Sequence, residues 1–143
     1  MFYPFFTAIV TLVAAILYFW FIMRVALRRG KANIPGYVAD LPQDLAVAQR
    51  IQINTAEHLV LFLPLLWLCA SLTTDEYSAI VGGVWVLGRI IYAIGYTRAF
   101  EKRAVGFFIN VIAYVFLIGG TAWGLYHYYA YVHDMIGQQP PLP

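Results

Sequence analysis

Four long apolar stretches, separated by short polar segments, dominate the pattern of hydrophobic and polar positions along the chain. They cover approximately residues 3–25, 46–72, 77–98 and 104–129. Each reaches the roughly 20 residues that a helix needs to cross about 30 Å of hydrocarbon. The strands of a membrane barrel would be about 10 residues long and would alternate strictly in polarity. The pattern therefore predicts an all-α membrane protein, in which residues 1–143 form a single integral membrane domain, a bundle of four transmembrane helices.

The composition agrees with a membrane protein and excludes several other classes. Of the 143 residues, 62% are hydrophobic and 11% are charged, against about 45–50% and about 25% in soluble domains. The net charge of +2 is too small to indicate a nucleic-acid partner. The single cysteine, Cys69, excludes an intramolecular disulfide and a cysteine-based metal cluster. Because Cys69 lies within an apolar run, we expect it to be inert packing, and we expect no metal site.

The basic residues at the ends of the spans and in the connections predict the orientation of the chain. They lie beside the first and third connections and comprise Arg24, Arg28, Arg29, Lys31, Arg98, Lys102 and Arg103. The turn between the second and third spans carries only acids, Asp75 and Glu76. Because loops rich in Lys and Arg stay in the cytoplasm, we expect both basic loops to be cytoplasmic and both termini to lie across the membrane.

Charged residues inside the spans predict a functional site. An ionised side chain in a span costs several kcal/mol unless it is paired or reaches water, so such residues face the interior of the bundle. Arg50, Asn54 and Glu57 stand at i, i+4 and i+7, which places them on one face of the second helix, with His58 beside them.

A second polar stripe follows on the third span. Arg89, Tyr92 and Tyr96 stand at i, i+3 and i+7, and Arg103 continues the same direction beyond the end of the span. Two such stripes on neighbouring helices must meet each other, since they would otherwise meet lipid. They predict a cationic, hydrogen-bonding pocket toward the cytoplasmic side of the bilayer.

A purely structural interpretation is also open. Arg50 and Glu57 could form an ion pair that locks helices together, with Asn54 bonding across the interface. Aromatic residues make up 17% of the chain, and tyrosines at the ends of spans are common interfacial anchors. On composition alone, this alternative and a ligand site are about equally supported.

Two segments resemble the signatures of the MAPEG family, the membrane-associated proteins of eicosanoid and glutathione metabolism. The segment QRIQINTAEHLVLFLPLLW contains the pattern R-x-x-x-N-x-x-E at Arg50, Asn54 and Glu57. The segment GRIIYAIGYTRAFEKR is similar to the third-helix signature and supplies Tyr92, Gly95, Tyr96 and Arg103. The sequence YTRAFEKRAVGF resembles bacterial members, which implies a bacterial inner membrane.

The resemblance implies a homotrimer that holds glutathione, its co-substrate, at each subunit interface. It assigns glutathione binding to Arg50, Asn54, Glu57, His58, Tyr92, Tyr96, Gln52, Arg28 and Arg29, and thiol activation to Arg103. Gln52 would contact the neighbouring subunit, and either Arg28 or Arg29 would supply the arginine of the first helix. His58 departs from the leukotriene-forming branch, which has a tyrosine there, and makes a leukotriene substrate doubtful.

The expected function is therefore a membrane-bound glutathione S-transferase, with glutathione peroxidase activity as a further possibility. Its second substrate would be a hydrophobic small molecule or lipid electrophile that arrives through the surrounding membrane lipid. A non-catalytic member of the same family that binds lipid or fatty acid is the first alternative. A small transporter or channel is the second, but it requires polar residues through to the far side, where LVLFLPLLWL is entirely apolar.

Overall fold

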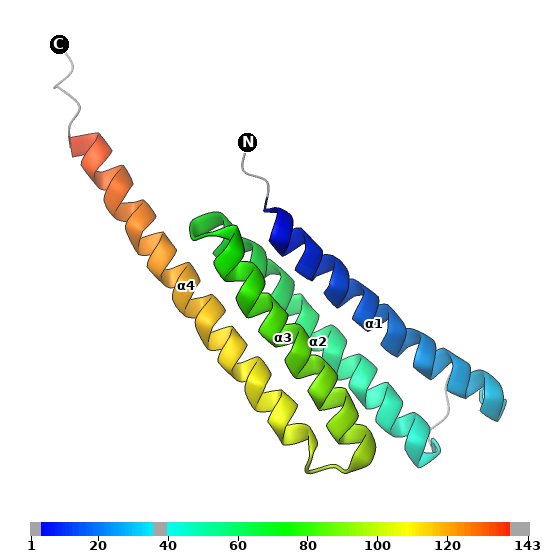
Figure 1. Ribbon diagram of the computed structural model, residues 1–143. Helices are drawn as coiled ribbons and strands as arrows, with labels where there is room; N and C mark the ends of the chain where they lie inside the picture. The colour runs from blue at the N-terminus through cyan, green and yellow to red at the C-terminus, as the bar shows by residue number, and fades with distance from the viewer. Residues whose placement is uncertain (1–3, 36–39, 138–143) are drawn as a thin grey trace.

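The structure is a computed structural model that describes residues 4–35 and 40–137. Four α-helices account for almost all of these residues: α1 (Phe5–Ala32), α2 (Gln43–Leu72), α3 (Asp75–Arg98) and α4 (Arg103–Gly137). They lie side by side in alternating directions, as Figure 1 shows. All four are long and apolar enough to cross a membrane. The predicted all-α bundle of four candidate spans is confirmed, and the chain is an integral membrane protein.

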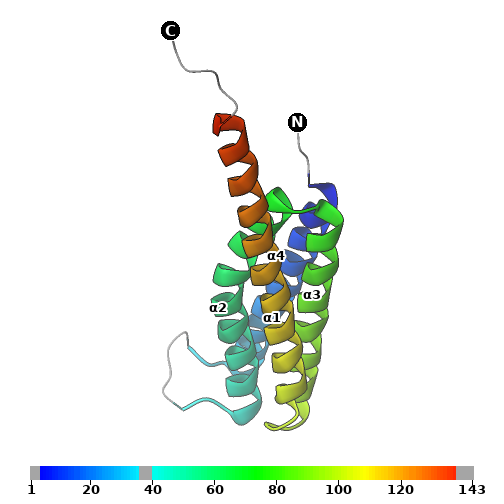
Figure 2. The same cartoon turned by 90° about the vertical axis from the view of Figure 1, so that its left-hand side faces the viewer.

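Each helix differs in length from the span expected for it. The predicted start of the first span, at residue 3, lies outside the described residues. Helix α1 continues seven residues beyond residue 25, and α4 continues eight residues beyond residue 129. At about 1.5 Å per residue, α4 is about 52 Å long, so it extends past the turn between α2 and α3 (Figures 1 and 2). The helices continue beyond the apolar stretches because the backbone hydrogen bonds of a helix form in water as well as in lipid.

The connections place the charged segments at opposite ends of the bundle. The end of α1, the start of α2 and the segment that joins α3 to α4 lie at one end, and the turn between α2 and α3 lies at the other (Figure 1). Asp75 ties this turn to the start of α1, since its carboxylate oxygens accept hydrogen bonds from the backbone N–H groups of Phe6 and Thr7, each at 2.8 Å. Thr74 caps α3 itself by accepting from the Tyr77 N–H at 3.2 Å.

The core lies between α2, α3 and α4, with α1 packed against α2 and α3. Within the described part of the chain, α1 and α4 make no contact. The rings of Phe62 and Trp85 stack at the centre, 3.9 Å apart and nearly parallel, and both side chains are fully buried. Cys69 is also fully buried in this core, as the sequence predicts. The outer surface is apolar, with Val60 77% exposed, as a surface that faces lipid requires.

Helices α3 and α4 approach closely where glycines remove the side chain. A Cβ atom on Gly106 of α4 would overlap backbone atoms of Tyr92 and Gly88 on α3. Asn110 fits beside Gly88 and donates from its amide nitrogen to the Trp85 carbonyl oxygen at 2.7 Å. This close packing sets the position of the second half of α3, which carries Tyr92 and Tyr96.

Candidate functional site

A cavity of about 330 Å³ lies at the end of the bundle that carries the basic connections. The α2 residues Arg50, Asn54 and Glu57 line it, together with Tyr92 and Tyr96 of α3 and Arg103 at the start of α4. Glu57 and Arg103 therefore border one space, which is the arrangement that the two predicted polar stripes require. Ile53 and Phe100 complete the lining.

Arg50 and Glu57, two charged residues of the cavity, do not pair with each other. In the described residues, Arg50 and Glu57 form no hydrogen bond or ion pair, either together or with another residue. Both are exposed to the cavity and the outside. The proposed structural ion pair of Arg50 with Glu57 is therefore absent from this part of the chain, although Asn54 does bond across the helix interface, to Arg89. A carboxylate and a guanidinium without internal partners suit a ligand that carries both signs of charge.

Aromatic rings hold the third charged group. The guanidinium of Arg103 lies 3.7 Å from the centroid of the Phe100 ring and 4.9 Å from that of Tyr96. Tyr96 in turn meets Tyr92 edge to face at 5.8 Å. Contacts of a cation with ring faces orient the guanidinium, and they leave its N–H groups able to donate to an anion. Sequence reasoning missed Phe100, whose only signal is its position three residues before Arg103.

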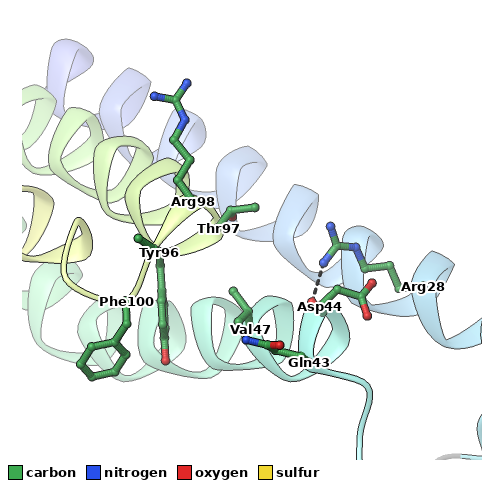
Figure 3. Close-up of a pocket in the computed structure, with 9 residues that line it drawn as sticks. Arg28, Gln43, Asp44, Val47, Tyr96, Thr97, Arg98 and Phe100 are labelled. Atoms are coloured by element: carbon green, nitrogen blue, oxygen red, sulfur yellow. Dashed lines mark hydrogen bonds between the residues drawn. The ribbon is translucent and has the colours of Figure 1, made fainter.

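A second cavity of about 610 Å³ adjoins the first, because Tyr96 and Phe100 line both. Figure 3 shows these two rings on one side of the second cavity and Arg28 on the other. Arg28 comes from α1 and donates to the Asp44 carbonyl oxygen at 2.6 Å. Arg29 instead donates to the Pro35 carbonyl oxygen and to the Gln49 side chain, both at 3.1 Å. Of the two arginines that the sequence left open, Arg28 lines this adjoining cavity and Arg29 does not.

Like Arg28 and Arg29, three further predicted residues do not line the first cavity. His58 faces α4, where the Tyr114 hydroxyl donates to the His58 carbonyl oxygen at 3.0 Å and lies 3.2 Å from its Nδ1 atom. Gln52 is half-buried and lines neither cavity. Arg89 is fully buried behind the lining and bonds to Asn54 and Thr55. The periodicity that placed Arg89 on the stripe with Tyr92 thus identifies its face but not its depth.

The arrangement can bind a small zwitterionic molecule whose negative groups outnumber its positive ones. Arg50 and Arg103 offer cationic donors, Glu57 offers one anionic acceptor, and Tyr92 and Tyr96 offer hydroxyl groups. Glutathione, with two carboxylates, one ammonium and a thiol, has this pattern of charge, so the side chains present fit it. No group of three or more His, Cys, Asp or Glu residues that could hold a metal occurs in the described ranges.

Comparison with known proteins identifies similar sequences and a matching family. A protein of Synechocystis sp., itself uncharacterized, is 39% identical over 114 residues, which cover 80% of this chain and 83% of that protein. Leukotriene C4 synthase of Bos taurus is 27% identical over 82% of this chain and 79% of its own length. Human microsomal glutathione S-transferase 2 is 31% identical over 66% of this chain and 68% of its own length. The model of the MAPEG family matches residues 7–123, and the chain therefore belongs to the MAPEG family.

Proposed function

We propose that this protein is a membrane-bound glutathione S-transferase that activates the glutathione thiol for attack on a hydrophobic electrophile from the bilayer. The observation that carries the proposal is that Glu57 and Arg103, from different helices, line one polar cavity in an otherwise apolar bundle. Relatives whose names include leukotriene C4 synthase and microsomal glutathione S-transferase support the choice of glutathione.

The residues of the cavity divide the binding task by charge. Arg50 binds a carboxylate through its planar, two-pronged donor group, and Arg28 reaches a second carboxylate from the adjoining cavity. Glu57 binds the γ-glutamyl ammonium. The tyrosine hydroxyls and the Asn54 amide donate or accept along the peptide, which fixes the position of the bound molecule.

Arg103 is the catalytic residue of this proposal. Glutathione supplies the nucleophile, a thiol that reacts as its thiolate. A free cysteine thiol has a pKa of about 8.5, and a guanidinium beside the sulfur in a poorly hydrated site favours the anion. A decrease of one pKa unit corresponds to about 1.4 kcal/mol. The apolar outer surface next to the cavity admits the electrophile from lipid, so proximity supplies much of the remaining acceleration.

A homotrimeric assembly and an orientation in the membrane are proposed together with this function. Arg50 and Glu57 lie at the outer side of the cavity, where a neighbouring copy in a homotrimer would enclose the ligand. Gln52, half-buried and away from the lining, is the proposed contact to that neighbour. The end with the basic connections would face the cytoplasm of a bacterial inner membrane.

The test is a titration of the purified protein with glutathione by calorimetry, followed by turnover assays. Glutathione binding together with conjugation of a halonitrobenzene supports the proposal, and reduction of a lipid hydroperoxide would add peroxidase activity to it. Binding without turnover of either substrate would favour a non-catalytic lipid-binding protein. Absence of binding would contradict the proposal.

A further inference from the structure

Arg89 is a buried charge whose presence the proposed site does not yet explain. Its side chain is fully buried in the middle of α3. Its Nη2 atom donates to the Asn54 Oδ1 atom at 3.0 Å and to the Thr55 Oγ1 atom at 2.8 Å. Its Nε and Nη1 atoms have no partner, and no carboxylate pairs with it in the described part of the chain. A buried guanidinium without a counter-ion is unfavourable for the fold, which points to a role beyond packing.

The contact with Asn54 decides which end of that carboxamide faces the cavity. A guanidinium only donates, so it can bond to the amide oxygen and not to the amide nitrogen. Because the Asn54 oxygen is held by Arg89 and Asn54 lines the cavity, the remaining NH₂ group is left to donate to a bound molecule. Without Arg89, the two ends of the carboxamide could exchange places.

Arg89 also contacts the ring of Tyr92, the most buried of the aromatic residues that line the cavity. Its guanidinium lies 4.5 Å from the centroid of the Tyr92 ring. Tyr92 contacts Tyr96, which lies against Arg103. Arg89 therefore touches two lining residues of the cavity from behind, Asn54 and Tyr92, without lining the cavity itself.

We propose that Arg89 is a positioning residue, which holds the Asn54 carboxamide so that its N–H groups donate to a carbonyl or carboxylate oxygen of glutathione. This inference rests on the proposed function. The buried Arg89 side chain fixes the direction of one hydrogen bond from Asn54 to the ligand. An apolar residue at this position could not fix it.

Calorimetric titration with glutathione tests this on the full-length protein, with thermal unfolding measured in parallel. Arg89→Met removes the charge while keeping an unbranched side chain of similar length, and replacement of a buried ion by an apolar group is often tolerated by the fold. We expect the Kd for glutathione to rise about tenfold, as for the loss of one hydrogen bond to a charged or oriented group. Combined with Asn54→Ala, the change should add less than about twofold to the effect of Asn54→Ala alone, because both act on one contact.

Asn54→Asp separates positioning from packing. The introduced carboxylate would pair with Arg89 and satisfy its charge, so the variant should unfold at a temperature no lower than the natural protein. It would nevertheless lack the N–H donor, and its Kd should rise at least as much as that of Arg89→Met. Normal glutathione binding by Asn54→Asp would show that no N–H donor is needed at this position, and that result would overturn the inference.

Thr55→Val is the matched control. Thr55 accepts from the same Nη2 atom as Asn54 but does not line the cavity, so its loss should change the Kd by less than about twofold. A loss of affinity in Thr55→Val equal to that in Arg89→Met would overturn the inference, as would unchanged affinity in Arg89→Met. If the natural protein itself binds no glutathione, the proposed function fails and this inference fails with it, an outcome distinct from the other two.

Discussion

The guanidinium carbon of Arg103 lies 3.7 Å from the centroid of the Phe100 ring, and no carboxylate in the described part of the chain pairs with it. A ring contact orients a cation without neutralising its charge. Arg103 therefore presents a positive charge to the cavity. An ion pair with a carboxylate would have neutralised that charge. The proposed activation of the glutathione thiol depends on that uncompensated charge.

Replacement of Arg103 should remove thiolate from the bound state while leaving part of the binding intact. At a pH below that at which free glutathione ionises, Arg103→Ala should decrease the ultraviolet thiolate absorbance of the complex about tenfold, which is one pKa unit. Arg103→Lys should keep part of the signal. The control is Arg98→Ala, since Arg98 lines the adjoining cavity but not the first one, and it points away from the Tyr96 ring (Figure 3). Persistence of the thiolate in Arg103→Ala would show that its role is misassigned.

Glu57 should recognise the ammonium group and no other part of glutathione. Glu57→Gln should weaken glutathione binding by about tenfold, because a charge-assisted hydrogen bond becomes a neutral one. An analogue that lacks the γ-glutamyl amino group should bind the natural protein and the variant equally. Calorimetry with both ligands measures this difference. An equal loss of affinity for both ligands would indicate that Glu57 shapes the cavity without contacting the ammonium.

Asp75 should stabilise the bundle by joining the turn before α3 to the start of α1. Its two carboxylate oxygens accept from the N–H groups of Phe6 and Thr7, which the first turn of α1 would otherwise leave unpaired. Asp75→Ala should decrease the free energy of unfolding by about 1 kcal/mol, measured by unfolding in detergent. Glu76→Ala, one residue further along α3 and without a bond to α1, should have a smaller effect. Equal effects would mean that the charge near α3 matters and the cap does not.

Gly106 should be intolerant of any side chain. A methyl group there would overlap backbone atoms of Tyr92 and Gly88, so Gly106→Ala should push α3 and α4 apart and destabilise the protein by about 1–3 kcal/mol. Glutathione affinity should fall as well, because Tyr92 would shift. In the same helix, a Cβ atom on Gly119 meets nothing within 4 Å, and Gly119→Ala should instead stabilise α4 by about 0.5–1 kcal/mol. If Gly106→Ala unfolded at the same temperature as the natural protein, that result would contradict this packing.

The candidate site was largely predictable because its residues repeat at helical spacing. A residue of a membrane helix faces either lipid or protein, so the spacing of Arg50, Asn54 and Glu57 predicts a shared inward face before any coordinates are known. The same argument applies to Tyr92 and Tyr96 on α3. The structure confirms that these faces line one cavity.

Periodicity, however, gives the direction of a side chain without its depth or its partner. Arg89 shares the face of Tyr92, yet it lies behind the cavity and bonds to Asn54. His58 turns to Tyr114 on α4, because the rotation of α2 about its axis depends on its packing against the other three helices. Arg28 lines the adjoining cavity and Arg29 does not, because of the way the last turn of α1 meets the start of α2.

The sequence by itself determined the four helices, the ends at which the charges gather and the two polar faces, since the need to satisfy backbone groups and charges in lipid leaves few alternatives. Only the tertiary structure decided which polar groups meet one another and which remain without partners. Those outcomes depend on contacts between residues 35 to 56 positions apart, such as Asn54 with Arg89 and His58 with Tyr114, and no local pattern encodes such contacts.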